Sequence, residues 1–127
     1  MSPFSALVLA MLGGTFLAVV ATSQFVSAGS QQGKELFQTR CGGCHSLDAD
    51  KVGPRLRGVF GRPVASVQSF RYSDAARSSH VKWDETALDK WLAEPDSVIP
   101  DSDMSFRLEN GRERVAIIEY LKHLDQR

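Results

Sequence analysis

The fold of this chain is constrained most by one run of five residues, Cys41-Gly42-Gly43-Cys44-His45. The C-x-x-C-H pattern is typical of covalent attachment of a c-type haem. Thiols three residues apart reach the two vinyl groups on neighbouring sides of the porphyrin, and the histidine that follows comes beneath the iron. The glycines permit the tight backbone path between the two bonds. We therefore predict one covalently bound haem c, attached through Cys41 and Cys44, with His45 as an iron ligand.

Three other interpretations of the same residues are weaker. A thioredoxin-type redox pair would need a βαβ setting, of which the sequence gives no sign. A plain disulfide in an exported protein would leave the adjacent histidine and the long loops unexplained. A zinc site would need a fourth ligand, and His80 and His123 are poorly placed to supply one.

The first 33 residues carry no charged side chain, and residues 4–21 are almost wholly apolar. Val26 and Ala28 are small enough for the last positions before a signal-peptidase cut, so residues 1–28 are expected to form a signal peptide and residues 29–127 the mature domain. An uncleaved membrane anchor is the serious alternative, because 18 apolar residues are near the lower limit for spanning a bilayer. A buried core helix is less favoured, since such a helix should be amphipathic. Either main interpretation predicts export, which places the domain in the periplasm.

The exported part is expected to be one all-α domain with long loops. Helices are predicted over residues 31–40, from an N-cap at Asp84 until Pro95 ends the second one, and over 112–124, with a shorter helical turn starting at Ser73. A broad apolar face supports the last of these helices. That face consists of Val115, Ile117, Ile118, Tyr120, Leu121 and Leu124.

Two stretches rich in glycine, proline and short polar residues, 52–70 and 95–111, are expected to be loops. A domain of about 99 residues with three modest helices buries little apolar surface for its size. Long loops usually need a function or something to enclose. A large apolar cofactor would supply the missing centre.

Charge narrows the choice of partners. The chain has 15 Lys and Arg against 15 Asp and Glu, so its formal net charge is zero. A nucleic-acid-binding protein would need a surplus or a stripe of basic residues. We therefore expect no nucleic-acid partner.

A haem iron held by His45 needs a second axial ligand, and the candidates are His80, His123, Met104 and the lysines. His123 lies in the last turn of the terminal helix, where an imidazole more often faces solvent and the negative helix end. His80 follows a polar stretch. Met104 lies in a Pro-initiated polar loop with no helical apolar stripe to join, which favours it as the ligand. A thioether favours ferrous iron, and two filled axial positions leave no open site for a substrate.

Residues 33–122 also resemble class I cytochromes c, close to the mitochondrial cytochrome c and bacterial cytochrome c2 type. The resemblance implies a small class I fold, in which about three to five short helices and long loops wrap round the haem. It rests on landmarks that stand in the family's order. They are Gly33, Phe37, Cys41, Cys44, His45, Lys51, Val52, Gly53, Pro54, Leu56, Gly58, Phe60, Gly61, Arg62, Phe70, Arg71, Tyr72, Ser73, Asp74, Ala75, Trp83, Pro100, Met104, Tyr120 and Leu121.

The resemblance assigns roles around the haem. The Pro54 carbonyl is expected to accept a hydrogen bond from the His45 imidazole. Met104 falls on the ligand loop, and Trp91 stands where the family usually has a tyrosine that hydrogen-bonds the methionine sulfur. The residues implied to face the haem propionates are Arg62, Tyr72, Ser73 and Trp83.

By this resemblance the protein is a monomeric single-electron carrier of a respiratory or similar electron-transport chain and not an enzyme. Its partners would be a reductase or dehydrogenase that donates electrons and an oxidase or reaction centre that accepts them. A haem-based gas sensor or small haem enzyme is the alternative if Met104 does not bind the iron. Either function uses iron in one haem.

Departures from the family bear on docking. Asp96-Ser97 and Asp103 stand where lysines are common, and Asp101 replaces a glycine. The usual ring of lysines around the haem edge is therefore interrupted by acid. We predict a docking face of mixed charge that steers partners only weakly.

Overall fold

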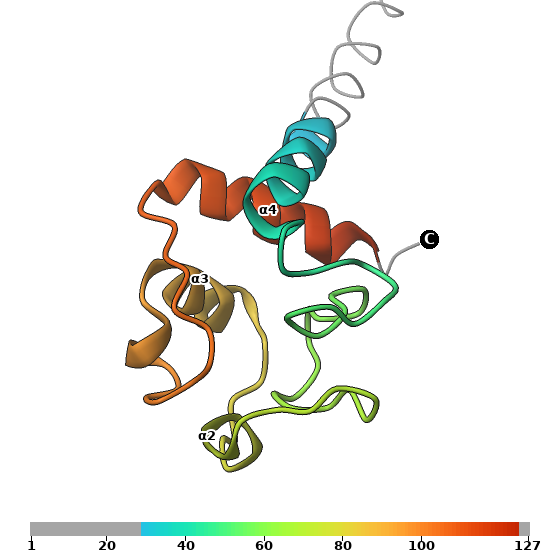
Figure 1. Cartoon of the computed structure of the whole chain (residues 1–127). Coiled ribbons are helices and arrows are strands. Elements are labelled where there is room, and N and C mark those ends of the chain that lie inside the picture. The colour runs from blue at the N-terminus through green and yellow to red at the C-terminus, as the bar shows by residue number, and fades with distance from the viewer. Residues whose placement is uncertain (1–28, 125–127) are drawn as a thin grey trace, which may run out of the picture.

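The structure is a computed structural model that describes residues 29–124. The predicted signal peptide or anchor, residues 1–28, lies outside the described residues. Across 29–124 the chain forms helices and loops, and its β pairing is limited to one isolated antiparallel bridge between Pro63 and Lys82. This confirms the all-α prediction (Figure 1). No helix in that part of the chain is long and apolar enough to cross a bilayer.

The first helix changes its winding before the cysteines. Residues 29–36 are α-helical, and a π-helical turn, η1, follows over Phe37–Cys41. The sequence predicted one regular helix over 31–40. The difference arises because the Gly42 N–H donates to the Phe37 carbonyl five residues back, at 3.0 Å. Such wider turns are frequent at functional sites, and this one ends at the first cysteine of the motif.

Two helices begin where the sequence predicted, and each start has a side-chain cap. In α2 (Asp74–Arg77) the Ser73 hydroxyl accepts from the Ala76 N–H, and in α3 (Glu85–Ala93) the Asp84 carboxylate accepts from the Ala87 N–H. These caps satisfy backbone donors that have no partner inside the helix. The α3 helix ends before Pro95, which starts the short 3-10 helix η2 (Pro95–Ser97).

The terminal helix, α4 (Gly111–His123), is capped by Asn110 and buries four residues of the predicted apolar face, Ile117, Ile118, Tyr120 and Leu121. The prediction was wrong for Val115, which is 57% exposed. Val115 borders a groove whose α3 side consists of polar and charged residues, so no apolar partner covers it. That side is formed by Glu85, Thr86, Asp89 and Lys90.

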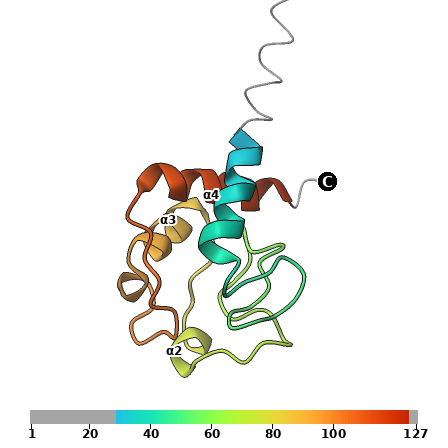
Figure 2. The same ribbon diagram turned by 45° about the horizontal axis from the view of Figure 1, so that its top comes forward.

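The N-terminal helix crosses α4 at close range, and the two views show the crossing from different sides (Figures 1 and 2). A Cβ atom on Gly33 would lie only 2.3 Å from the Ala116 carbonyl oxygen, so the absence of a side chain permits the approach. One turn later the rings of Phe37 and Tyr120 pack with their centroids 5.7 Å apart. Cys41 therefore lies at the end of a helix that is packed against α4.

The apolar core lies at this crossing and under α3, which packs on α4. A half-buried ion pair joins α3 to α4, with Arg114 Nε 2.7 Å from an Asp89 carboxylate oxygen. The loops extend from this core to enclose a cavity, which the core residues Val59, Val64 and Trp83 also line. The buried core cluster consists of Phe37, Val59, Val64, Trp83, Leu88, Leu92, Ile99, Leu108, Ile117, Ile118, Tyr120 and Leu121.

Candidate haem site

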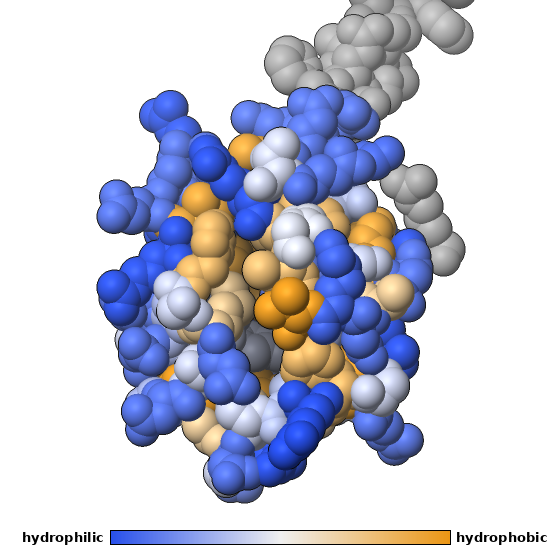
Figure 3. Space-filling view, in the orientation of Figure 1, coloured by the Kyte–Doolittle hydropathy of each residue, from blue (hydrophilic) through white to orange (hydrophobic). Residues whose placement is uncertain are grey.

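The two long loops and the C-x-x-C-H segment enclose a cavity of about 470 Å³. It opens on the molecular face seen in Figure 3, as a hollow bordered by apolar residues with hydrophilic ones around them. Every residue that the sequence assigned to the haem lines this cavity. They are Cys41, Cys44, His45, Pro54, Arg62, Tyr72, Ser73, Trp83, Trp91 and Met104.

The His45 imidazole is oriented by the backbone of the following loop. Its Nδ1 lies 2.7 Å from the Pro54 carbonyl oxygen. A carbonyl only accepts, so Nδ1 carries the proton and Nε2 keeps a free lone pair. Gly53 packs beneath the ring, where a Cβ atom would lie 2.2 Å from His45 Cε1. The loop thus holds the imidazole from the side and from below.

Burial lowers the pKa of His45, a shift that the Pro54 hydrogen bond opposes and that the charges of Lys51 and Arg62 reinforce. A lowered pKa keeps the imidazole neutral, which is the form that binds metal. The residue is therefore prepared as a ligand by desolvation as well as by orientation.

The two cysteines differ in their surroundings. Cys41 is half-buried at the end of η1, and burial raises the pKa of its thiol to about 11, with a further contribution from Cys44. Cys44 is exposed at the mouth of the cavity. A redox-active pair needs a thiol of lowered pKa. The pKa of the Cys41 thiol is raised instead, which suits a sulfur that forms a permanent covalent bond.

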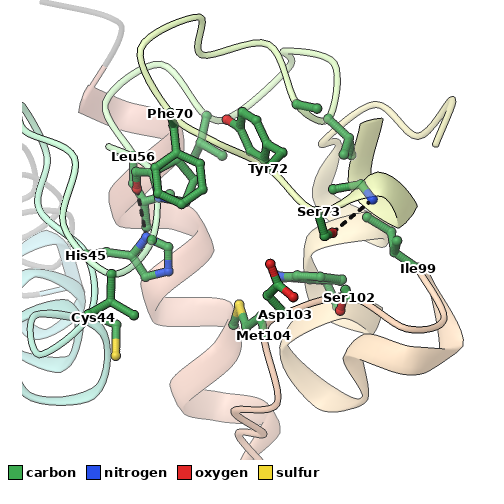
Figure 4. Close-up of a pocket in the computed structure, with 18 of the residues that line it drawn as sticks. Cys44, His45, Leu56, Phe70, Tyr72, Ser73, Ile99, Ser102, Asp103 and Met104 are labelled. Carbon is green, nitrogen blue, oxygen red and sulfur yellow. Dashed lines mark hydrogen bonds between the residues drawn. The ribbon is translucent and has the colours of Figure 1, made fainter. Parts of the chain in front are cut away.

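Met104 reaches the cavity from the opposite wall, on the loop that follows η2. Figure 4 shows the His45 ring and the Met104 sulfur on different segments, both facing the space between them. The other candidate ligands lie elsewhere, because His80 is exposed and His123 lies 3.2 Å from Glu119 on α4. Within the described residues, only Met104 among these three candidates lines the cavity.

The residues expected at the propionates line the cavity, and three of them, Arg62, Tyr72 and Ser73, have hydrogen bonds to the backbone. Arg62 donates to the carbonyls of Arg55 at 2.7 Å and Arg57 at 3.1 Å. Hydroxyl oxygens of Tyr72 and Ser73 accept backbone N–H groups, so each keeps its own proton to donate.

The two tryptophans of the cavity wall pack together. Trp83 and Trp91 have ring centroids 5.2 Å apart and are tilted by 56°. Trp83 is buried and belongs to the core, whereas Trp91 is half-buried against it. The pair joins the segment before α3 to α3 itself, and so gives the cavity a rigid aromatic side.

Two residues were missed as site residues by sequence reasoning. Gly53 appeared only as a family landmark, and its role depends on the position of the His45 ring. Ser102 lines the cavity and has a buried hydroxyl without a hydrogen-bond partner in the described structure. A buried polar group of this kind calls for a partner, and a polar group of a bound cofactor would supply one. No sequence pattern indicated that Gly53 lies against the His45 ring or that the Ser102 hydroxyl is buried.

These residues fit a haem. The donor set combines two thiols, an imidazole on one wall and a thioether on the other, in a mostly apolar cavity that hydroxyl and guanidinium groups also line. Within the described residues no group of three or more histidine, cysteine or acidic side chains is arranged to hold a metal ion, so a zinc site receives no support there.

The family model for cytochrome c matches residues 30–125. The chain belongs to the cytochrome c family. It is 46% identical over 89 residues to cytochrome c2 iso-2 of Magnetospirillum molischianum, with 68% of this chain and 92% of the relative covered. It is 35% identical over 102 residues to cytochrome c of Stellaria longipes, with 77% and 94% covered.

A solved relative has the same fold. Cytochrome cH from Methylobacterium extorquens matches with a TM-score of 0.69 and 33% identity, over 73% of this chain and 96% of that one. The cytochrome therefore has one covalently bound haem c as its cofactor, and Cys41 and Cys44 fit the attachment motif. As a member of this family it is a haem c electron carrier.

A carboxylate clamps the loop that carries His45. Asp50 accepts from the Ser69 hydroxyl at 2.6 Å and from the Arg55 N–H at 2.9 Å. These hydrogen bonds, the Ser69 one first, lower the pKa of Asp50 below its ordinary value of 3.8. Because the folded state favours the charged form, the clamp stabilises the fold above the ordinary pKa and is lost as the pH falls through the lower folded value.

We accordingly expect Asp50→Asn to lower the melting temperature near neutral pH, and we expect the difference between the two proteins to shrink as the pH falls below the ordinary pKa of 3.8 and through the lower folded value. Thermal melts of the two proteins across this range measure the difference. A difference that is constant with pH would show that the charge of Asp50 does not contribute.

Proposed function

We propose that this cytochrome is an exported carrier that accepts and donates single electrons at a haem with His45 and Met104 as axial ligands. When bound, the haem supplies a one-electron iron couple, and the protein supplies no substrate site. The signal peptide 1–28, cleaved after Ala28, would deliver the domain to the periplasm. A reductase or dehydrogenase and an oxidase or reaction centre are the proposed partner classes.

The single observation that carries this proposal is the placement of His45 and Met104 on opposite walls of one cavity (Figure 4). An imidazole and a thioether together fill both axial positions of an iron between them. The proposed carrier therefore differs from a gas sensor or haem enzyme, each of which needs an open position.

The surrounding residues support electron transfer by staying in place. The His45 ring is held by Pro54 and Gly53, and the haem would be attached to Cys41 at the end of η1 and to Cys44 three residues later. Aromatic residues form much of the remaining wall, with Phe70 and Tyr72 packed edge to face at 4.9 Å. A site held by these contacts would change little between oxidation states, which would keep the reorganisation cost of each electron transfer low.

The proposal is tested on protein purified from the periplasmic fraction, whose mass should correspond to a chain that begins at Gly29 and carries one haem. The ferric protein should show the far-red absorption band of methionine-ligated iron, and the ferrous protein should bind carbon monoxide slowly or not at all. Met104→Ala should remove the band and allow rapid carbon monoxide binding. His80→Ala and His123→Ala are the matched controls and should change neither property.

Rapid carbon monoxide binding by the unaltered protein would contradict the carrier and favour the sensor or enzyme. Absence of the band from the unaltered protein, with rapid carbon monoxide binding gained in His80→Ala or His123→Ala, would assign the second ligand to that histidine. Recovery of the protein in the membrane fraction, with a mass that includes residues 1–28, would show that these residues are an uncleaved membrane anchor.

A further inference from the structure

The loop that carries Met104 leaves the end of α3 and returns to it (Figure 1). Its return stem is joined to α3 at the buried Leu108, whose N–H donates to the Leu92 carbonyl at 2.7 Å. Arg114 Nη1 donates to the carbonyls of Leu108 and Glu109, at 2.9 Å each. The base of the loop is therefore closed by hydrogen bonds to both backbone groups of Leu108.

Between the two stems the segment around Met104 has few polar contacts. Ile99 is buried and its N–H donates to the Pro95 carbonyl at 3.0 Å, so the outgoing stem is fixed as far as this residue. In the part of the chain that the structure describes, residues 103–106 have no hydrogen bond or ion pair. The position of Met104 therefore depends on its packing against the core and on the contacts that hold the two stems together.

One guanidinium group joins the two stems beside the base of the loop. Arg107 Nη2, on the return stem, lies 2.6 Å from Glu94 Oε1 and 3.8 Å from Asp96 Oδ2 on the outgoing stem. We call these two ion pairs the stem bridge. Glu94 Oε1 is buried and has no hydrogen-bond partner in the described structure, so the charge of Arg107 is what balances it. Because a buried charge without a countercharge is costly, the stem bridge favours the closed loop.

We propose that Arg107 is a positioning residue for Met104, and that the stem bridge sets how rapidly the Met104 thioether leaves the iron. The proposal rests on the function proposed above, because it takes Met104 as the second axial ligand. Arg107 itself does not line the cavity, so it acts through the loop that it closes. Its side chain is 53% exposed, and salt weakens ion pairs that are open to water.

Imidazole binding to the ferric protein measures release of the thioether. Imidazole replaces the thioether on the iron without electron transfer, and the far-red band of methionine-ligated iron disappears as it binds. At high imidazole the rate reaches a limit set by the departure of Met104. The loop offers no competing ligand of its own, since residues 95–108 contain no lysine, histidine or cysteine. Stopped-flow absorption at increasing imidazole concentrations gives this limiting rate.

Variants of the guanidinium group test its part in the release. Arg107→Gln should raise the limiting rate about three- to fivefold, the upper end of what exposed ion pairs contribute. Arg107→Lys keeps the charge and should restore part of the slow release. Arg112→Gln is the matched control, because Arg112 is exposed and has no ion pair among the described residues. It removes the same charge and should leave the limiting rate unchanged.

Variants of the two carboxylates test the same contact from the other stem. Glu94→Gln should raise the limiting rate as Arg107→Gln does, and Asp96→Asn should raise it less, because Asp96 lies farther from the guanidinium group. Glu94→Gln combined with Arg107→Gln should have no larger effect than either change alone, since both remove one interaction. Multiplied effects in the double variant would show that the two residues act separately and would contradict the stem bridge.

Salt distinguishes the stem bridge from a general loss of stability. Raising the salt from about 0.01 M to 1 M shortens the screening length from about 30 Å to 3 Å. The limiting rate of the unaltered protein should rise about two- to threefold over this range, whereas the Arg107→Gln protein should respond much less. An equal response to salt in both proteins, or equal limiting rates in Arg107→Gln and Arg112→Gln, would overturn the proposal.

The two proposals fail in different ways. Absorption spectra and midpoint potentials report the axial ligands, and those of the Arg107 variants should match the unaltered cytochrome, whereas the limiting rate reports the stem bridge. A ferric protein without the far-red band would contradict the proposed function and the role of Arg107 with it. A normal band combined with an unchanged limiting rate in Arg107→Gln would contradict only the role of Arg107.

Discussion

Gly53→Ala is expected to remove the ligand geometry of His45. The new Cβ atom would lie 2.2 Å from Cε1 and 2.7 Å from both ring nitrogens, far inside van der Waals contact. The His45 ring cannot simply rotate away from the new Cβ atom. His45 directly follows Cys44 in the chain, and its Nδ1 is hydrogen-bonded to the Pro54 carbonyl. The Gly53 backbone is also fixed, because its N–H donates to the Cys44 carbonyl at 2.9 Å. Neither side can move without breaking a contact.

We expect the Gly53→Ala protein to lose about 3 kcal/mol of folding free energy or more, as severe overpacking does. Its yield of haem-loaded protein should fall, and what remains should lack the spectrum of the unaltered cytochrome. Gly43→Ala is the control within the same segment, since a Cβ atom there meets nothing within 4 Å. A Gly53→Ala protein with normal stability and spectrum would show that the His45 ring is not confined as described.

Gly33→Ala is expected to separate the N-terminal helix from α4. The added Cβ would lie 2.3 Å from the Ala116 carbonyl oxygen and 2.7 Å from Tyr120 Cβ, both belonging to the rigid part of α4. Alanine favours a helix by about 1 kcal/mol over glycine, which offsets only part of the clash. We expect a net loss of about 2–3 kcal/mol in the free energy of unfolding, or a fall of roughly 10–20 °C in melting temperature.

Chemical denaturation and thermal melts measure this loss. Gly29→Ala in the same helix is the matched control, because a Cβ atom at position 29 meets nothing within 4 Å. A loss of similar size in both variants would attribute the effect to the helix itself and not to the crossing. A stabilised Gly33→Ala protein would contradict the close approach.

The cofactor and the attachment residues could be predicted from the sequence because the chemistry requires adjacent residues. Two thiols and an imidazole must be presented at fixed spacing, and Cys41, Cys44 and His45 supply them within five residues. Helix starts were equally local, since the caps at Ser73 and Asp84 bond N–H groups three residues away. Local rules of this kind leave little for tertiary structure to decide.

Other features depend on segments that are distant in sequence. Val115 continues an apolar pattern yet stays exposed, because α3 places polar residues beside it. The helix before Cys41 winds as a π turn through a bond from Gly42 that no residue pattern announces. Ser102 is polar and in a loop, and only the packing of the Met104 segment buries its hydroxyl.

The sequence by itself therefore determined the covalent haem c, the all-α class and the family, since all three rest on short motifs and periodic patterns. Only the tertiary structure decided that Met104, and not His80 or His123, lines the cavity with His45. Met104 lies 59 residues after His45, so its position depends on how its loop folds back to the cavity. The structure also decided that Val52 and Phe106, which belong to different loops, both line this cavity. Burial and pairing are properties of the whole packed chain, so no segment encodes them alone.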